Sequence, residues 1–291
     1  MFAMLYDFFL APFADYAFMK RALVACLALA LGGGPVGVLL VLRRMSLMGD
    51  ALAHSVLPGA AIGFVVGGLW LPAIGIGGAV AGLAVALLSG AASRATGLME
   101  EASLAGFFLI ALAAGVLIVS VGGTAVDLTN LLFGSVLAVD SASLMLVAGI
   151  ASVTLGTLAV AWRPLIAESF DPEFMALAGG GGRWHMLFLI LVVINLVAGF
   201  QALGTLMALG LMILPAVAAR LWARDVWGMA VTAAGIALAS GYGGLLISWH
   251  AGAPSGPAIV LVAGAVYAAS LFAGPQGGVL RGRQRTYHRH G

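Results

Sequence analysis

Long apolar runs dominate this chain, and charged or turn-rich breaks separate them. A run of about 20 apolar residues can cross the hydrocarbon core of a bilayer as a helix. The third and sixth runs are short, so we expect eight or nine spans in an all-α, polytopic transmembrane bundle. The candidate spans are Ala22–Leu42, Asp50–Leu69, Ala73–Ser89, Leu104–Val121, Ser143–Ala161, Met186–Phe200, Thr205–Leu221, Val226–Ile247 and Ala258–Phe272.

Arginine marks one side of these spans. If the spans alternate in direction, all of the 13 Lys and Arg residues except Lys20 and Arg21 fall on the same side, which the positive-inside rule makes cytoplasmic. We therefore divide the chain into an N-terminal segment 1–21, which is aromatic enough to be an interfacial helix, a single transmembrane domain 22–273, and a basic, disordered cytoplasmic tail 274–291.

Composition supports a membrane protein and excludes several other classes. Only 8% of the residues are charged and 63% are hydrophobic, whereas soluble domains carry about 25% charged residues. The single Cys26 excludes a disulfide framework or a CxxC metal site. The basic residues are scattered, so we expect no nucleic-acid partner. No HExxH, GxSxG or P-loop motif is present, so neither hydrolysis nor ATP binding is expected of this chain.

Two segments outside the spans have helical character. The stretch AVDLTNLLFGSVLAVD (125–140) is too short to cross, so we expect a re-entrant or interfacial helix on the outer side, flanked by Asp127 and Asp140 as capping or solvated residues. The cytoplasmic loop 162–184 contains SFDPEFMALAGG, which predicts a short surface helix. Ser169 is its candidate N-cap, Pro172 lies in its first turn, and glycines 179–182 close it.

Asp50 and His54 are the strongest candidates for chemistry. Residues four apart share one helix face, and a carboxylate and an imidazole are both ligands of divalent transition metals. The alternative is that Asp50 caps the helix and His54 is a satisfied polar residue. Ser46 could equally be the cap, which would place Asp50 and His54 roughly 6 and 12 Å into the helix. Ionisable groups at such depth are costly, which favours a polar pathway.

Several stretches resemble one known family. The stretch VLRRMSLMGDALAHSVLPGAAIGF (41–64) resembles the signature of the ABC-3 family, the bacterial ABC-transporter permeases for zinc, manganese and chelated iron. Further blocks of the same family, in the same order, are similar to LFGSVLAV (132–139), SFDPEFMALAGG (169–180), LGTLMALGLMILPAVAARL (203–221) and PSGPAIVL (254–261). The run of four glycines at 179–182 departs from the pattern.

The resemblance implies a homodimeric, multi-pass permease of the bacterial plasma membrane. A separate cytoplasmic ATPase subunit would bind and hydrolyse ATP, and a periplasmic or lipoprotein metal-binding protein would deliver the ion. The chain would be no enzyme and would hold no cofactor of its own. The resemblance assigns metal transit to Asp50 and His54. It assigns a coupling helix that docks into the ATPase to Ser169, Phe170, Asp171, Pro172, Glu173, Ala176 and Gly179.

The transported metal is a choice among similar ions. Imidazole with carboxylate suits zinc, and manganese almost as well, so we expect zinc, with manganese or iron as the alternative. A competing class is a stand-alone transporter that uses Asp50 and His54 as a proton relay. The cytoplasmic helix around SFDPE favours the ATP-driven importer.

Overall fold

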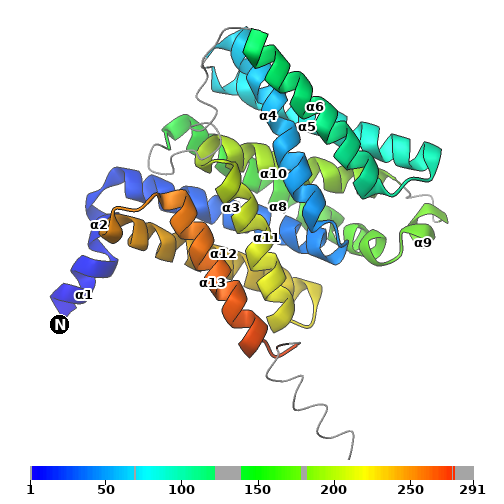
Figure 1. The fold of residues 1–291 in the computed structure, drawn as a ribbon. Coiled ribbons are helices and arrows are strands. Elements are labelled where there is room, and N and C mark those ends of the chain that lie inside the picture. Colours follow the sequence, from blue (N-terminus) through cyan, green and yellow to red (C-terminus); the bar gives the residue numbers. More distant parts are fainter. Residues whose placement is uncertain (1, 69, 122–138, 178–181, 277, 279–291) are drawn as a thin grey trace, which may run out of the picture.

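The structure is a computed structural model and describes residues 2–68, 70–121, 139–177, 182–276 and 278. Within these residues it is all-α, without a strand (Figure 1). The helices, labelled as in Figure 1, are α1 (Phe2–Phe9), α2 (Ala11–Asp15), α3 (Ala17–Leu42), α4 (Ser46–Gly67), α5 (Leu71–Thr96), α6 (Glu100–Val121), α8 (Ser141–Phe170), α9 (Pro172–Leu177), α10 (Arg183–Leu203), α11 (Thr205–Trp222), α12 (Val226–Ala251) and α13 (Ser255–Ala273).

Nine of these described helices are long and apolar enough to cross a membrane, one at each predicted span. The two runs that looked short belong to α5 and α10, which have 26 and 21 residues. The predicted segment 125–140 lies outside the described residues except for Val139 and Asp140. Residues 279–291 of the basic tail also lie outside them.

Helix ends follow local chemistry. Asp140 caps α8 by accepting a hydrogen bond from the backbone N–H of Ser143 at 2.8 Å. Asp225 caps α12 in the same way. Gly97 ends α5 at a φ of +71°, a left-handed conformation that glycine adopts without steric cost.

The N-terminal segment lies against the last turns of α12. The hydroxyl of Tyr242 donates to the carbonyl of Phe9 at 2.8 Å, and the ring of His250 stacks on Phe8 with centroids 4.1 Å apart. Helix α3 begins at Ala17, so Lys20 and Arg21 lie in its first two turns and not in a preceding segment.

Helices α4, α5 and α6 form one group, and α3 packs with α8, α11 and α12 in another (Figure 1). Helix α10 contacts both groups. Within the first group α4 and α5 approach most closely where Gly59 faces Gly77, since a side chain on either glycine would overlap the backbone carbonyl of the other. Small residues permit such contacts between membrane helices.

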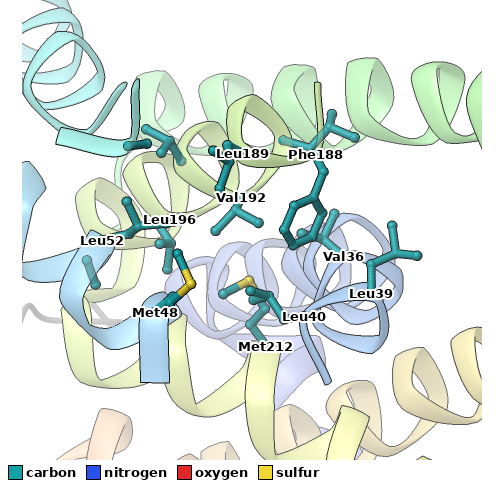
Figure 2. Packing of buried hydrophobic residues seen from close by; sticks show 14 of the residues in the cluster. Val36, Leu39, Leu40, Met48, Leu52, Phe188, Leu189, Val192, Leu196 and Met212 are labelled. Atoms are coloured by element: carbon teal, nitrogen blue, oxygen red, sulfur yellow. The ribbon is translucent and has the colours of Figure 1, made fainter. Parts of the chain in front are cut away.

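The largest apolar core joins the two groups (Figure 2). Helix α4 inserts Met48 and Leu52 into it, and both side chains are almost fully buried. Their neighbours come from three other helices and include Val36, Leu39 and Leu40 of α3, Phe188, Leu189, Val192 and Leu196 of α10, and Met212 of α11. Because the buried residues of α4 fix its rotation, they also determine which residues face outward.

Candidate functional site

Asp50 and His54 lie inside α4 and not at its end. The helix begins at Ser46, with Met45 in the N-cap position and no side-chain capping bond. The interpretation of Asp50 or Ser46 as the cap is therefore wrong. At 1.5 Å per residue Asp50 lies about 6 Å and His54 about 12 Å beyond Ser46, which places His54 well within the span of a 22-residue helix.

The two side chains form an open pair on one face of α4. His54 Nε2 lies 3.6 Å from Asp50 Oδ1, and the side chains are 38% and 61% exposed. The ring of Phe108 on α6 is 6.0 Å from that of His54 and borders the pair on one side. No further metal-binding side chain is close by, since the described residues contain no group of three or more His, Cys, Asp or Glu. One copy of the chain thus offers two donors at this point.

The face around the pair is open and apolar. Leu47 lies one turn before Asp50 and is 78% exposed, and Val65, near the far end of α4, is 49% exposed. At 100° per residue these two side chains point in nearly the same direction as Asp50 and His54. An ionisable pair therefore lies among exposed apolar side chains on a candidate membrane span of the single chain, where it would be costly to leave against lipid.

The predicted cytoplasmic helix exists, but its boundaries differ from those expected. Helix α8 continues to Phe170, nine residues beyond the predicted span, and α9 follows from Pro172 to Leu177. Asp171 separates them, and its Oδ1 accepts from the backbone N–H of Phe174 at 2.9 Å. Asp171 therefore caps the short helix, and the assignment of that cap to Ser169 is wrong.

The residues of this segment divide into inward and outward groups. Ser169 faces inward, and its hydroxyl donates to the carbonyl of Leu165 at 2.6 Å. Asp171, Pro172 and Glu173 are exposed, as are the rings of Phe170 and Phe174. Ala176 is part of α9, whereas Gly179 lies outside the described residues. The outward group combines two aromatic rings with two acids, a surface suited to a protein partner.

A cluster of charged and polar side chains joins four helix ends next to this segment. We call it the Arg43 cluster. Arg43 follows the last residue of α3, and Glu168 and Ser169 lie in the last turn of α8. His185 lies in the first turn of α10, and Glu100 begins α6. The side chains of Arg43 and Glu168 are each only 6% exposed, and Arg43 Nη2 lies 3.6 Å from Glu168 Oε2.

Three nitrogens of the Arg43 guanidinium have polar partners within the chain. Its Nε donates to Ser169 Oγ at 3.0 Å, its Nη2 to the carbonyl of Leu165 at 3.4 Å, and its Nη1 lies 3.1 Å from His185 Nδ1. The guanidinium also lies over the ring of Phe188, 4.1 Å from its centroid. Burial lowers the pKa of Arg43, while the charge of Glu168 opposes that shift. An arginine pKa is normally far above neutral, so the group stays charged.

The sequence did not reveal this cluster. Arginines in general marked the cytoplasmic side there, and the loop 162–184 was expected only to contain a short surface helix. The partners of Arg43 are separated from it by 126 and 142 residues, so no local spacing connects them. One signal was present, namely that Arg43 and Ser169 both belong to stretches that resemble blocks of one family.

Comparisons with known proteins agree with the fold and with the quoted stretches. The ABC 3 transport family matches residues 15–274. The manganese transport system membrane protein MntC of Halalkalibacterium halodurans is 33% identical over 275 residues, which cover 94% of this chain and 93% of that protein. The chelated iron transport system membrane protein YfeD of Yersinia pestis is 30% identical, with 92% and 89% covered.

A solved structure supports the architecture. The chain is similar to one in the structure of PsaBC from Streptococcus pneumoniae in complex with Fab, with a TM-score of 0.82 and 28% sequence identity. The match covers 97% of this chain and 100% of that one. The manganese import system permease protein ScaB of Streptococcus parasanguinis is also 30% identical, with 92% of this chain and 95% of that protein covered.

Proposed function

Because the chain belongs to the ABC 3 transport family, we propose that it imports manganese as a homodimer whose two Asp50–His54 pairs face each other along the transit path. Its general role follows from membership of the family: it is the metal-uptake permease subunit of an ABC importer in the bacterial inner membrane. ATP hydrolysis belongs to a separate subunit, so the permease itself is not an enzyme.

The open Asp50–His54 pair carries this proposal. A carboxylate and an imidazole that point out of a membrane helix need a polar partner, because lipid supplies none. A second copy placed against the same face of α4 would remove the pair from lipid and bring two further donors. Two Asp and two His would bind a divalent ion with oxygen and nitrogen donors and without thiolates, a set that suits an ion which must also be released.

The relatives favour manganese over zinc, whereas the side chains of Asp50 and His54 favour neither metal. The relatives named above are described as manganese or chelated iron transporters, and none of them as a zinc transporter. Our expectation of zinc therefore has no support from them. Carboxylate oxygens suit manganese, whereas imidazole suits zinc and iron, so the pair by itself does not select among them.

The exposed surface of α9 is the proposed contact with the ATPase. Phe170, Asp171, Pro172 and Glu173 would meet that subunit, with Ala176 and Gly179 following on the same segment. Ser169 would act from inside, through its bond to Arg43. A metal-binding protein on the outer side would deliver the ion. A proton-coupled transporter would need no such surface on the arginine-rich side.

The test is manganese uptake into vesicles that contain the permease, its ATPase and the metal-binding protein. We expect the double variant Asp50→Asn with His54→Gln to fold normally and to reduce ATP-dependent uptake to the level seen without ATP. Asp225→Asn is the matched control, since it removes another exposed carboxylate and keeps the cap of α12. Full uptake by the double variant would refute the transit path, and uptake driven by a proton gradient without ATP would refute the class.

The choice of metal has its own readout in the same vesicles. We expect faster initial uptake with manganese as the only ion than with zinc or ferrous iron. Faster uptake of zinc would overturn the assignment of manganese while leaving the transit path intact.

A further inference from the structure

The Arg43 cluster lies close to three parts of the proposed importer, namely α9, α4 and α6. Glu168 and Ser169 lie in the last turn of α8, directly before the α9 segment. Arg43 precedes α4 by two residues, and α4 carries Asp50 and His54. Glu100 begins α6, which packs on α4 and borders His54 through Phe108. The cluster therefore touches both the segment proposed to meet the ATPase and the helices that hold the transit pair.

We propose that Arg43 and His185 are positioning residues that transmit a displacement of the α9 segment to α4 and α6. This inference rests on the proposed function, because it takes α9 as the contact with the ATPase and α4 as the carrier of the transit pair. It adds a physical connection between them, made of side chains to which neither the sequence nor the relatives assign a role.

One tautomer of the His185 ring satisfies both of its hydrogen-bond partners. A guanidinium has only donors, so His185 Nδ1, 3.1 Å from Arg43 Nη1, must accept. His185 Nε2 lies 2.8 Å from Glu100 Oε1, and an ionised carboxylate only accepts, so Nε2 carries the hydrogen. The ring is thus a neutral bridge between a cation and an anion. The ring is hydrogen-bonded to Arg43 on one side and to Glu100 on the other, and it thereby links α3 and α8 to α6.

The corner between α3 and α4 is tight enough to carry movement. The backbone N–H of Met45 donates to the carbonyl of Leu40 at 2.9 Å, and that of Arg44 donates to Val41 at 3.2 Å. Arg44 has a φ of +59°, the only positive φ among the described residues other than glycine. Such a conformation persists where its surroundings hold it in place. Because this corner is held by hydrogen bonds, a shift of Arg43 displaces the first turn of α4 and is not absorbed by a flexible linker.

A second metal site is the obvious alternative for a His and two acids close together, and the geometry opposes it. The lone pair of His185 Nδ1 already faces the Arg43 guanidinium. A cation at His185 or Glu168 would lie beside the buried positive charge of Arg43, and like charges repel strongly where water is excluded. The described residues also hold no group of three metal-binding side chains at this point.

The experiment compares two substitutions of His185 in the complete complex. Leucine removes both hydrogen bonds, whereas the amide of glutamine offers one acceptor and one donor, as the neutral imidazole does. Both variants keep the Arg43–Glu168 ion pair, so neither leaves a buried charge unpaired. The readout is the number of manganese ions imported per ATP hydrolysed, in vesicles with equal amounts of assembled complex.

We expect His185→Leu to lower the ions imported per ATP by about five- to tenfold or more, the range of typical coupling between two sites. His185→Gln should restore most of the loss. Arg224→Gln is the matched control, since it removes another exposed arginine, outside the α3–α4 corner, and should import as many ions per ATP as the wild type. An unchanged ratio in His185→Leu would overturn the inference, as would equal losses in the leucine and glutamine variants.

A second variant tests Arg43 itself. Replacing Arg43 by Met together with Glu168 by Leu removes both buried charges at once and should fold, since well-packed apolar replacements of buried ion pairs are commonly tolerated. We expect it to retain manganese binding and assembly with the ATPase but to import few ions per ATP. A wild-type ratio in this variant would contradict the role of Arg43. Loss of manganese binding at Asp50 and His54 would instead count against the proposed function.

Discussion

The chain contains two acid–base pairs, Arg43 with Glu168 and Asp50 with His54, and the fold treats them in opposite ways. Arg43 and Glu168 come from different helices, are buried, and belong to a cluster with several hydrogen bonds. Asp50 and His54 are the same 3.6 Å apart as that pair, but they share one helix, face outward and are 61% and 38% exposed. A buried charge that stabilises the fold is paired with a second charge of the same chain. An ionisable pair that is exposed on an apolar face has room to bind a ligand or a second copy of the chain.

The largest effect on stability should come from breaking the buried pair. Glu168→Leu leaves the Arg43 guanidinium buried without its counter-charge, which typically costs about 3–5 kcal/mol. Asp50→Asn, by contrast, changes an exposed side chain and should stay within about 0.5 kcal/mol of the wild type. Unfolding of the purified permease in a denaturing detergent titration measures both. Comparable losses of unfolding free energy in the two variants would contradict the view that Arg43–Glu168 stabilises the fold and Asp50–His54 does not.

A smaller effect is expected when both buried partners are replaced. The variant with Arg43→Met and Glu168→Leu should recover much of the stability that Glu168→Leu loses alone, because no unpaired charge remains. The difference between the double variant and the sum of the single ones, obtained by the same titration, gives the coupling of the pair. If the double variant is as unstable as the sum of the single variants, the ion pair is not the reason for the loss.

The smallest effect concerns Asp140, an exposed acid that already has a partner. Hydrogen bonds from the hydroxyl and the backbone N–H of Ser143 lower the pKa of this carboxyl. Its contribution to stability is therefore complete above the ordinary aspartate pKa near 4, and it is lost as the pH falls through the lower value of the folded state.

Asp140→Asn should accordingly leave uptake unchanged and alter stability by no more than about 0.5 kcal/mol, since Asn also caps helices well. Stability of the variant should no longer depend on pH through this position. Manganese uptake and detergent titrations between pH 3 and 7 check both statements, with Asp50→Asn as the comparison. A loss of uptake in Asp140→Asn would mean that exposure of an acid does not identify the transit path.

The positions of the spans could be predicted because hydropathy reports them directly. The nine long apolar helices of the described residues coincide with apolar runs, and even the short run at Met186–Phe200 lies within α10. The extension of α8 to Phe170 could not be found in this way, because its last turns contain Arg163, Pro164 and Glu168. Beyond the bilayer a helix needs no apolar character, so hydropathy loses its signal there.

The candidate site was only partly accessible from the sequence. Asp50 and His54 share one helix, so their four-residue spacing sufficed to bring them together. Glu168 and His185 reach Arg43 from two other helices, Glu100 reaches His185 from a third, and such contacts leave no periodic pattern. The cap at Asp171 was assigned two residues too early because Ser and Asp are equally good caps, and only the backbone bond from Phe174 distinguishes them.

The most direct test of the account is the stoichiometry and nitrogen coordination of Mn²⁺ on the purified permease, measured by electron paramagnetic resonance. We predict one bound ion for every two chains, with magnetic coupling to histidine nitrogen that disappears in His54→Gln and persists in His185→Gln. One ion per chain, or nitrogen coupling unaffected by His54→Gln, would contradict a transit site shared by two Asp50–His54 pairs.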